Sequence, residues 1–372
     1  MKNNPLKNLE TLGQSIWLDY IRRDLIASGE LRRLIEEDGL RGMTSNPSIF
    51  EKAIAESHIY DQDIHDMALK KKDVKTIYET ISQRDVQNAA DEFRSVYEKT
   101  DGKDGYVSLE VNPHLAHDTK GTIKEARRLW AALNKPNVFI KVPATSEGLP
   151  AIQQLINEGI NVNVTLLFGL PRYREVAEAY IAGLEARIAQ GKSVKHIASV
   201  ASFFLSRIDS MVDPMVEKFL EPDCEKTEIA KKVRGQVAIA SAKIAYQIYK
   251  EIFSSNRFKK LVDKGARPQR LLWASTSTKN PEYSDVKYIE SLVGPDTVNT
   301  VPPETFDAYR DHGDPKSRLE QDVKEADWIM ARLPELGISI DKVTGQLEDA
   351  GVKKFNEPFD KLMEALMKKS SE

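Results

Sequence analysis

The sequence predicts an α/β fold, a single (β/α)8 TIM barrel with additional helices at the N- and C-terminal ends. Eight short segments with strand-like alternation are separated by helical stretches along the 372 residues. Strands that alternate with helices favour parallel pairing through right-handed crossovers, and a count of eight favours a closed barrel over an open sheet. Neither a GxGxxG nor a P-loop motif follows the first strand, so the usual sign of a nucleotide-binding open sheet is absent.

The predicted strands are short runs in which the side chains alternate between an apolar face and a second face. The clearest case is 161–166, where Asn163 and Thr165 lie on one face and three apolar residues lie on the other. Such a polar face would not meet solvent in a strand that helices flank. The strands are predicted at 15–21, 41–47, 106–111, 137–145, 161–166, 196–202, 270–275 and 297–302.

Helical stretches with apolar stripes and end signals separate these strands. A helix at 22–38 should stop at Gly39, and Ser146 is the expected N-cap of a helix that Gly159 ends. Pro171 suits the first turn of the next helix. Helical stretches are predicted up to residue 12, at 22–38, between 47 and 105, after 111, at 146–157, from 171, between 207 and 268, and in the tail after 302, whose last helix is predicted at 357–368.

Bulk composition excludes several classes of function. Charged residues make up 30% of the chain and the formal net charge is -3, so no basic excess indicates nucleic acid. No apolar stretch is long enough for a signal peptide or a membrane span, and the one cysteine, Cys224, excludes an internal disulfide. We expect a cytoplasmic protein of one domain over 1–372, with a helical extension from about residue 303. A small-molecule partner is expected, rather than nucleic acid or a membrane, and a homo-oligomer is compatible with the sequence.

One lysine, Lys141, lies within 137–145, a segment that apart from this residue has the pattern of a buried strand. It shares a strand face with Phe139, whereas the flanking valine and isoleucine positions face the other way. An ammonium in a dry interior loses hydration, so it either finds a partner or lowers its pKa and becomes nucleophilic. The alternative interpretation is a lysine on an edge strand that faces water.

Polar residues on other strands favour the interpretation of Lys141 as a buried amine. Asp19, Glu110, Asn163 and Thr165 all lie on inward-facing positions near the C-terminal ends of their strands, the face where barrel enzymes build their sites. Interior polar groups are costly unless they meet one another. A buried amine beside two carboxylates predicts Schiff-base chemistry on a ketone, in which the iminium withdraws electrons and a carboxylate moves protons.

An anion site is predicted after the sixth and seventh strands. Ser202 and Arg207 follow the sixth strand, and Ser275 and Lys279 follow the seventh. Barrels often hold phosphate in these late loops, and a guanidinium can bind two phosphate oxygens at once. For Arg207 taken alone, a solvated arginine at a helix start is the alternative interpretation.

The histidines favour neither a metal nor a cofactor. His114 and His117 have the spacing of helix-borne ligands, but no further His or Cys cluster supports them, and Pro113 places them at a loop or helix start. His196, at the start of the sixth strand, is expected to be structural. We therefore predict no metal site and no cofactor.

Seven strand-end motifs, taken in chain order over nearly the whole sequence, resemble those of transaldolase. They are Trp-Leu-Asp19, Thr-Ser-Asn46-Pro, Val-Ser-Leu-Glu110, Phe-Ile-Lys141-Val-Pro-Ala-Thr, Asn163-Val-Thr165-Leu-Leu-Phe, Ser202-Phe-Phe204-Leu-Ser-Arg207-Ile-Asp and Trp-Ala-Ser275. The resemblance implies a transferase of the pentose phosphate pathway with sugar-phosphate partners. Such an enzyme moves a dihydroxyacetone unit from sedoheptulose 7-phosphate to glyceraldehyde 3-phosphate, giving erythrose 4-phosphate and fructose 6-phosphate.

The resemblance also implies roles for individual residues. Lys141 would form the Schiff base, Asp19 would be the acid and base of carbon–carbon cleavage and formation, and Glu110 with Thr165 would hold a catalytic water. Asn46 and Asn163 would bind the ketose and Phe204 would line its pocket. The substrate-binding set as a whole is Asn46, Asn163, Ser202, Phe204, Arg207, Ser275 and Lys279.

The sequence departs from the family pattern at one point. Many transaldolases place an arginine two residues after the position of Ser275, whereas this chain has Ser277 there, and we assign Lys279 to the phosphate instead. The chain resembles the longer subtype of the family, and its C-terminal helix is expected to cover the site.

Two other functions stay open at this point. One is another Schiff-base aldolase for phosphorylated sugars, in which water or a different acceptor replaces the aldose phosphate. The other is a catalytically silent barrel that binds sugar phosphates as a sensor.

Overall fold

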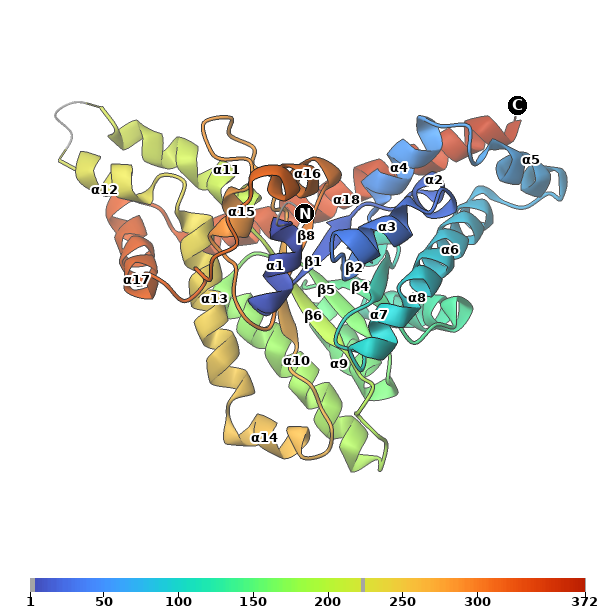
Figure 1. The fold of residues 1–372 in the computed structure, drawn as a ribbon, viewed down its shortest axis with the longest axis horizontal. Helices are drawn as coiled ribbons and strands as arrows, with labels where there is room; N and C mark the ends of the chain where they lie inside the picture. The colour runs from blue at the N-terminus through green and yellow to red at the C-terminus, as the bar shows by residue number, and fades with distance from the viewer. Residues whose placement is uncertain (1–3, 222–224, 372) are drawn as a thin grey trace.

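Eight parallel strands close into a barrel in which each strand pairs with its neighbours in chain order (Figure 1). This computed structural model describes residues 4–221 and 225–371, so Cys224 lies outside the described residues. The strands are β1 (Gln14–Asp19), β2 (Gly42–Thr44), β3 (Tyr106–Glu110), β4 (Val138–Pro143), β5 (Val162–Leu167), β6 (Ser199–Phe204), β7 (Arg270–Ala274) and β8 (Thr297–Val301). The predicted (β/α)8 barrel is confirmed.

Helices surround the barrel and extend it at both ends. Before β6 they are α1 (Pro5–Thr11), α2 (Arg23–Ala27), α3 (Glu30–Glu37), α4 (Pro47–Ala55), α5 (Asp61–Leu69), α6 (Val74–Glu92), α7 (Arg94–Lys99), η1 (Pro113–Leu115), α8 (Thr119–Leu133), α9 (Gly148–Glu158) and α10 (Leu170–Ala189). After β6 they are α11 (Ser206–Val216), η2 (Glu217–Phe219), α12 (Thr227–Val233), α13 (Val237–Phe253), α14 (Asn256–Val262), α15 (Lys287–Glu290), α16 (Pro303–His312), α17 (Val323–Arg332), η3 (Leu333–Leu336) and α18 (Ile340–Ser371). Among the described residues, none of these helices has the length and apolar character needed to cross a bilayer.

Several predicted boundaries are wrong for local reasons. The helix predicted at 22–38 is divided into α2 and α3 at Gly29, whose φ of +82° suits glycine and interrupts a helix. Ser146 is not the cap of α9, because the Thr145 hydroxyl accepts from the Gly148 amide at 3.0 Å. His196 lies in an exposed turn before β6 rather than in the strand.

The C-terminal helix is much longer than predicted. The tail was predicted to end in a helix at 357–368, whereas α18 is one helix of 32 residues that begins at Ile340. Pro358 lies inside it, and a proline inside a helix argues for a break when only the sequence is considered. The helix persists because its buried face packs on α4, α5, α6 and β5, across the mouth of the barrel (Figure 1).

Aromatic rings fill the barrel interior next to Lys141, on the side of the N-terminal ends of the strands. Phe139 stacks on Tyr106 with ring centroids 4.3 Å apart and on Trp17 at 6.1 Å. Gly42 on the neighbouring strand makes room for Trp17, since a Cβ there would lie 2.5 Å from the indole ring. Phe139 shares a strand face with Lys141 two residues later, so the amine stands directly above a dry aromatic layer.

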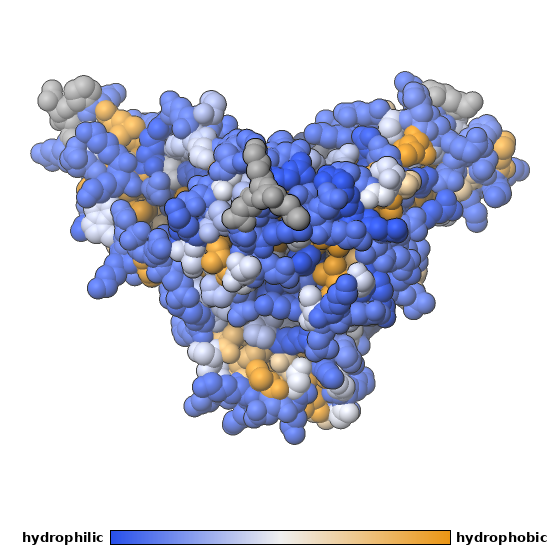
Figure 2. All heavy atoms as spheres, viewed as in Figure 1, coloured by the Kyte–Doolittle hydropathy of each residue, from blue (hydrophilic) through white to orange (hydrophobic). Residues whose placement is uncertain are grey.

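The outer surface carries many charges. Figure 2 shows a face that is mostly hydrophilic, with apolar side chains in small scattered groups. Among the described residues, the large hydrophobic side chains that are exposed are Ile59, Leu69, Val262 and Met367. The apolar side chains are otherwise largely committed to the barrel and to the helices packed on it.

A buried ion pair closes the opposite, N-terminal end of the barrel. Arg270, the first residue of β7, donates to Asp104 at 2.8 Å and to the Ser15 hydroxyl at 2.9 Å. The Ser15 hydroxyl in turn donates to the second carboxylate oxygen of Asp104 at 2.8 Å. All three residues are buried, so the guanidinium depends on this carboxylate for its charge partner.

Asp104→Ala should therefore destabilise the fold by about 3–5 kcal/mol, because it leaves the Arg270 charge buried and unpaired. Urea unfolding measures this free energy. Asp101→Asn is the matched control, since Asp101 is 81% exposed in its ion pair with Arg267 and asparagine tolerates its positive φ of +50°, so this change should cost less than about 1 kcal/mol. Equal losses in the two variants would contradict the assignment of a structural role to the buried pair.

Candidate active site

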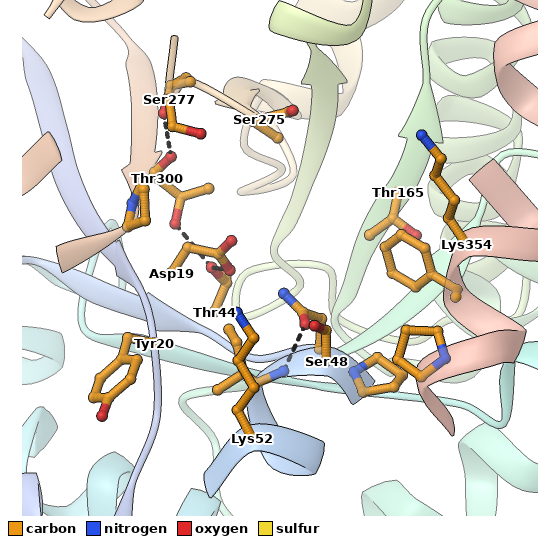
Figure 3. Close-up of a pocket in the computed structure, with 18 of the residues that line it drawn as sticks. Asp19, Tyr20, Thr44, Ser48, Lys52, Thr165, Ser275, Ser277, Thr300 and Lys354 are labelled. Atoms are coloured by element: carbon orange, nitrogen blue, oxygen red, sulfur yellow. Dashed lines mark hydrogen bonds between the residues drawn. The ribbon is translucent and has the colours of Figure 1, made fainter. Parts of the chain in front are cut away.

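A cavity of about 660 Å³ opens at the C-terminal ends of the strands (Figure 3). Every predicted site residue except Glu110 lines it, together with side chains from α4 and α18. The predicted residues that line it are Asp19, Asn46, Lys141, Asn163, Thr165, Ser202, Phe204, Arg207, Ser275 and Lys279. Side chains from eight segments of the chain thus meet around one space.

Strand register places three of these side chains in one row. Glu110 on β3 is the Cα partner of Lys141 on β4, and Lys141 is the partner of Asn163 on β5. Side chains at paired positions of parallel strands point to the same face. The carboxylate, amine and amide therefore stand side by side inside the barrel.

Lys141 is buried and fully engaged by its neighbours. Only 6% of its surface is exposed, its ammonium forms an ion pair with Glu110, and it donates to the Ser45 carbonyl at 2.6 Å. Burial raises the pKa of Glu110, and the Lys141 charge opposes that rise. The alternative interpretation, a water-facing lysine on an edge strand, is wrong. Glu110 is close enough to take a proton from the amine, and a neutral amine is the nucleophilic form.

A second, much smaller hollow lies beside Lys141. Its volume is about 20 Å³, and Glu110, Lys141, Thr165 and Phe355 contribute to its lining. That volume is close to the space that one water molecule needs. The Glu110 Oε2 atom has no hydrogen-bond partner among the described residues and is buried, so a water here would satisfy it.

Asp19 is held by a chain of hydroxyls at the edge of the cavity. The Thr44 hydroxyl donates to Asp19 Oδ1 at 2.6 Å and lies 2.8 Å from the Thr300 hydroxyl (Figure 3). Because the Thr44 proton is directed at Asp19, Thr300 is the donor of that second bond. Burial raises the pKa of Asp19, and the positive charge of Lys141 opposes the rise. A carboxyl group with a raised pKa suits both the donation and the acceptance of protons near neutral pH.

Two amides are oriented toward the cavity by different means. Asn46 caps α4 by accepting from the Ile49 amide at 3.0 Å, which leaves its NH₂ group for a ligand. Asn163 is fully buried, donates to the Ser108 hydroxyl at 3.2 Å and accepts from the Ser202 hydroxyl at 2.7 Å. Ser202 therefore orients Asn163 in addition to lining the cavity.

The predicted anion groups line this same cavity. Arg207 is partly buried, its Nη1 atom has no hydrogen-bond partner among the described residues, and burial lowers the pKa of its guanidinium. Arg207 thus lies at the start of α11, as the alternative interpretation expects, but it is partly buried and lines the cavity. The Ser275 hydroxyl lies 3.0 Å from that of Ser206, and Ser275 adopts a positive φ of +54°, an uncommon backbone conformation for serine. Lys279 donates to the Ser277 hydroxyl at 2.6 Å.

Several residues that line the cavity or hold its groups were not predicted from the sequence. Thr44 and Thr300 lie on barrel strands, and the alternation of β2 and β8 could have indicated their inward direction. Ser45 contributes only a backbone carbonyl, for which the sequence carries no signal. Lys354 and Phe355 were missed because the last helix was predicted to begin after them.

The two histidines with ligand-like spacing do not converge. His114 contacts Asp360 at 2.7 Å, whereas His117 contacts Glu147 at 3.1 Å. Within residues 4–221 and 225–371, no group of three or more His, Cys, Asp or Glu side chains has the arrangement of a metal site. Each histidine is thus accounted for by a separate carboxylate.

The chain is similar to known proteins over nearly its whole length. The family model described as transaldolase/fructose-6-phosphate aldolase matches residues 16–366. A protein named transaldolase from Trichodesmium erythraeum is 52% identical over 99% of this chain and 98% of its own length. Transaldolase 2 of Nostoc punctiforme is 50% identical over 98% and 97%, and a transaldolase of Thiobacillus denitrificans is 46% identical over 97% and 99%. The chain therefore belongs to the transaldolase/fructose-6-phosphate aldolase family.

Proposed function

We infer that this chain is a transaldolase of the pentose phosphate pathway, a transferase with sugar-phosphate substrates. It transfers a dihydroxyacetone unit from sedoheptulose 7-phosphate to glyceraldehyde 3-phosphate and yields erythrose 4-phosphate and fructose 6-phosphate. The observation that carries the inference is a buried amine, Lys141, paired with Glu110 at the C-terminal mouth of a barrel, in a chain of this family. A cytoplasmic location and a homo-oligomer stay predictions.

The proposed route begins with attack of the neutral Lys141 amine on the C2 carbonyl of the ketose phosphate. Glu110 takes the ammonium proton, and a water between Glu110 and Thr165 carries protons as the carbinolamine loses hydroxide and becomes an iminium. Asp19 then accepts the proton of the C4 hydroxyl while the C3–C4 bond breaks. The bonding electrons move into the iminium and leave an enamine on Lys141, and the aldose phosphate departs.

The second half of the reaction reverses these steps on a different aldose. The enamine carbon attacks the aldehyde of glyceraldehyde 3-phosphate, and Asp19 returns its proton to the new hydroxyl. Water then hydrolyses the iminium and frees fructose 6-phosphate and the Lys141 amine. In this proposal Asn46 and Asn163 bind the ketose hydroxyls, Phe204 lines the pocket, and Ser202 orients Asn163. Arg207, Ser275 and Lys279 hold the phosphate.

The decisive assay compares group transfer with simple cleavage, because the family description also covers fructose-6-phosphate aldolase. The enzyme is given fructose 6-phosphate with and without erythrose 4-phosphate. Glyceraldehyde 3-phosphate, sedoheptulose 7-phosphate and free dihydroxyacetone are then measured. A transaldolase should need the acceptor and release little dihydroxyacetone. Equal rates without the acceptor would favour the aldolase, and absence of turnover with retained binding would favour the sensor.

Activity should survive prolonged treatment with EDTA, because in this route an iminium formed on an amine withdraws electrons in the role that a Lewis acid plays elsewhere. The measurement is the transfer rate before and after dialysis against the chelator. Addition of Mg²⁺ or Zn²⁺ to the dialysed protein is the control. A large loss that either ion restores would contradict the proposed mechanism.

A further inference from the structure

Four cationic side chains around the cavity have no carboxylate within ion-pair distance among the described residues. They come from α4, α11, the loop after β7 and α18, and they are Lys52, Arg207, Lys279 and Lys354. Elsewhere charged side chains of this protein are commonly paired, as Arg257 is with Glu178 and Glu185. Unpaired cations around a concave space raise the local concentration of anions and favour a negatively charged ligand.

Lys354 differs from its neighbour on the same helix. In Figure 3 its side chain extends from α18 alongside the cavity, on the side of Thr165, and it is among the residues that line that space. Lys353, one residue earlier, is exposed as Lys354 is, but it does not line the cavity. One of two adjacent lysines is therefore presented to the site, and the packing of α18 across the barrel mouth determines which one.

The positive charge of Lys354 acts on Lys279, one of the residues predicted to bind the anion. Partial burial is the main cause that lowers the pKa of Lys279, and the positive charges of Arg207 and Lys354 lower it further. The carboxylate of Glu304 opposes this effect. Lys279 therefore lies within the electrostatic reach of both Arg207 and Lys354, which come from two other segments of the chain.

Such a cluster of like charges is unfavourable while the site is empty and becomes favourable with a dianion in it. A phosphate monoester carries about −1.5 to −2 charges near neutral pH and has three acceptor oxygens. Arg207 offers the unpartnered Nη1 donor, and Ser275 and Ser277, which line the same cavity, offer hydroxyls. A lysine opposite them would contribute a mobile point charge and further donors.

We propose that Lys354 of α18 is a substrate-binding residue that completes the phosphate site formed by Arg207, Ser275 and Lys279. The inference rests on the proposed function for the identity of the substrate. It gives α18 a direct part in recognition, beyond covering the barrel mouth. Lys354 would be the third cation of the phosphate site, after Arg207 and Lys279, and it comes from a helix far along the chain from both.

The test is Lys354→Ala, with Lys353→Ala as the matched control and Lys354→Arg as the conservative variant. Lys354→Ala should raise KM for fructose 6-phosphate roughly 10-fold, as expected for the loss of one charge-assisted hydrogen bond. Its kcat should change much less, and its kcat/KM for unphosphorylated fructose should stay at the wild-type value. Lys354→Arg should restore most of the affinity, and Lys353→Ala should behave as wild type.

A binding measurement separates this inference from the proposed function. Calorimetric titration with inorganic phosphate needs no turnover, and Lys354→Ala should weaken the Kd for phosphate by a similar factor. Wild-type phosphate affinity in Lys354→Ala would overturn the inference, as would equal losses with fructose and fructose 6-phosphate. Absence of transfer in the wild-type enzyme, with phosphate binding that still depends on Lys354, would overturn the proposed function and support the site.

Discussion

Lys141→Ala should lower the rate of group transfer by more than about 10⁴-fold, because no iminium can form without the primary amine. Steady-state assays with fructose 6-phosphate and erythrose 4-phosphate measure this loss. Borohydride reduction in the presence of fructose 6-phosphate should trap a three-carbon or six-carbon adduct on wild-type Lys141, visible in the mass of its peptide. The variant should give no adduct.

Lys141→Arg separates the charge of this residue from its nucleophilicity. The guanidinium keeps a positive charge beside Glu110, but it does not deprotonate in proteins and so cannot attack the ketone. We expect this variant to be as inactive as Lys141→Ala. Thermal unfolding of both variants checks that the loss is not one of folding. Full activity in either variant, or an adduct on a different lysine, would contradict the assignment of Lys141.

Asp19→Asn should lower the transfer rate by about 10²–10⁴-fold, the usual range for the loss of a general acid or base. The reason is that an amide cannot take the proton of the C4 hydroxyl when the C3–C4 bond breaks. Lys141 and Glu110 are untouched, so borohydride should still trap the intact six-carbon ketose on Lys141. Mass spectrometry of the trapped adduct therefore distinguishes a block in cleavage from a block in Schiff-base formation.

Thr44→Val is the matched comparison for Asp19→Asn. It removes the hydroxyl that donates to Asp19 at 2.6 Å but leaves the carboxylate in place. We expect a smaller loss of activity, with a change in the pH profile of the rate. If Asp19→Asn loses no more activity than Thr44→Val, Asp19 is a positioning residue and not the proton acceptor.

Asp19 also makes the stability of the protein depend on pH. Burial raises its pKa in the folded protein, so between the ordinary and the raised pKa the folded state holds a proton that the unfolded state has lost. The contribution of Asp19 to the unfolding free energy is complete at pH values below the ordinary aspartate pKa. It declines as the pH rises through the raised pKa of the folded protein. Asp19→Asn has no carboxylate to bury, so its unfolding free energy should exceed that of wild type increasingly as pH rises through this window.

The raised pKa of Asp19 should also set the pH at which the transfer rate falls on the acid side of the pH–rate profile. If ionised Asp19 is the base of cleavage, the transfer rate should fall as pH decreases through its raised pKa. The limb should therefore lie at a higher pH than for an ordinary aspartate. A pH–rate profile of wild type and Thr44→Val checks this point. An acid limb at the ordinary aspartate pKa would assign that proton transfer to another group.

Much of the barrel could be predicted because its strands carry a local signal. Alternation along 161–166 and 106–111 identified both the strands and the inward direction of Asn163, Thr165 and Glu110. The errors occurred where tertiary packing overrides local preference. Pro358 favours a break, yet α18 continues through it on an apolar face that packs against α4, α5, α6, α11, η1 and β5. This error affected the predicted site, because Lys354 and Phe355 lie before that proline and outside the helix predicted at 357–368.

The sequence by itself determined which strands form the barrel and which side chains face its interior, because a period of two residues is a property of the chain alone. Only the tertiary structure decided which of those side chains touch. The pairing of Glu110 with Lys141, the bond from Lys141 to the Ser45 carbonyl and the reach of Lys354 into the cavity all join distant segments. Such contacts depend on strand register and helix packing, which are set by the whole core rather than by any one segment.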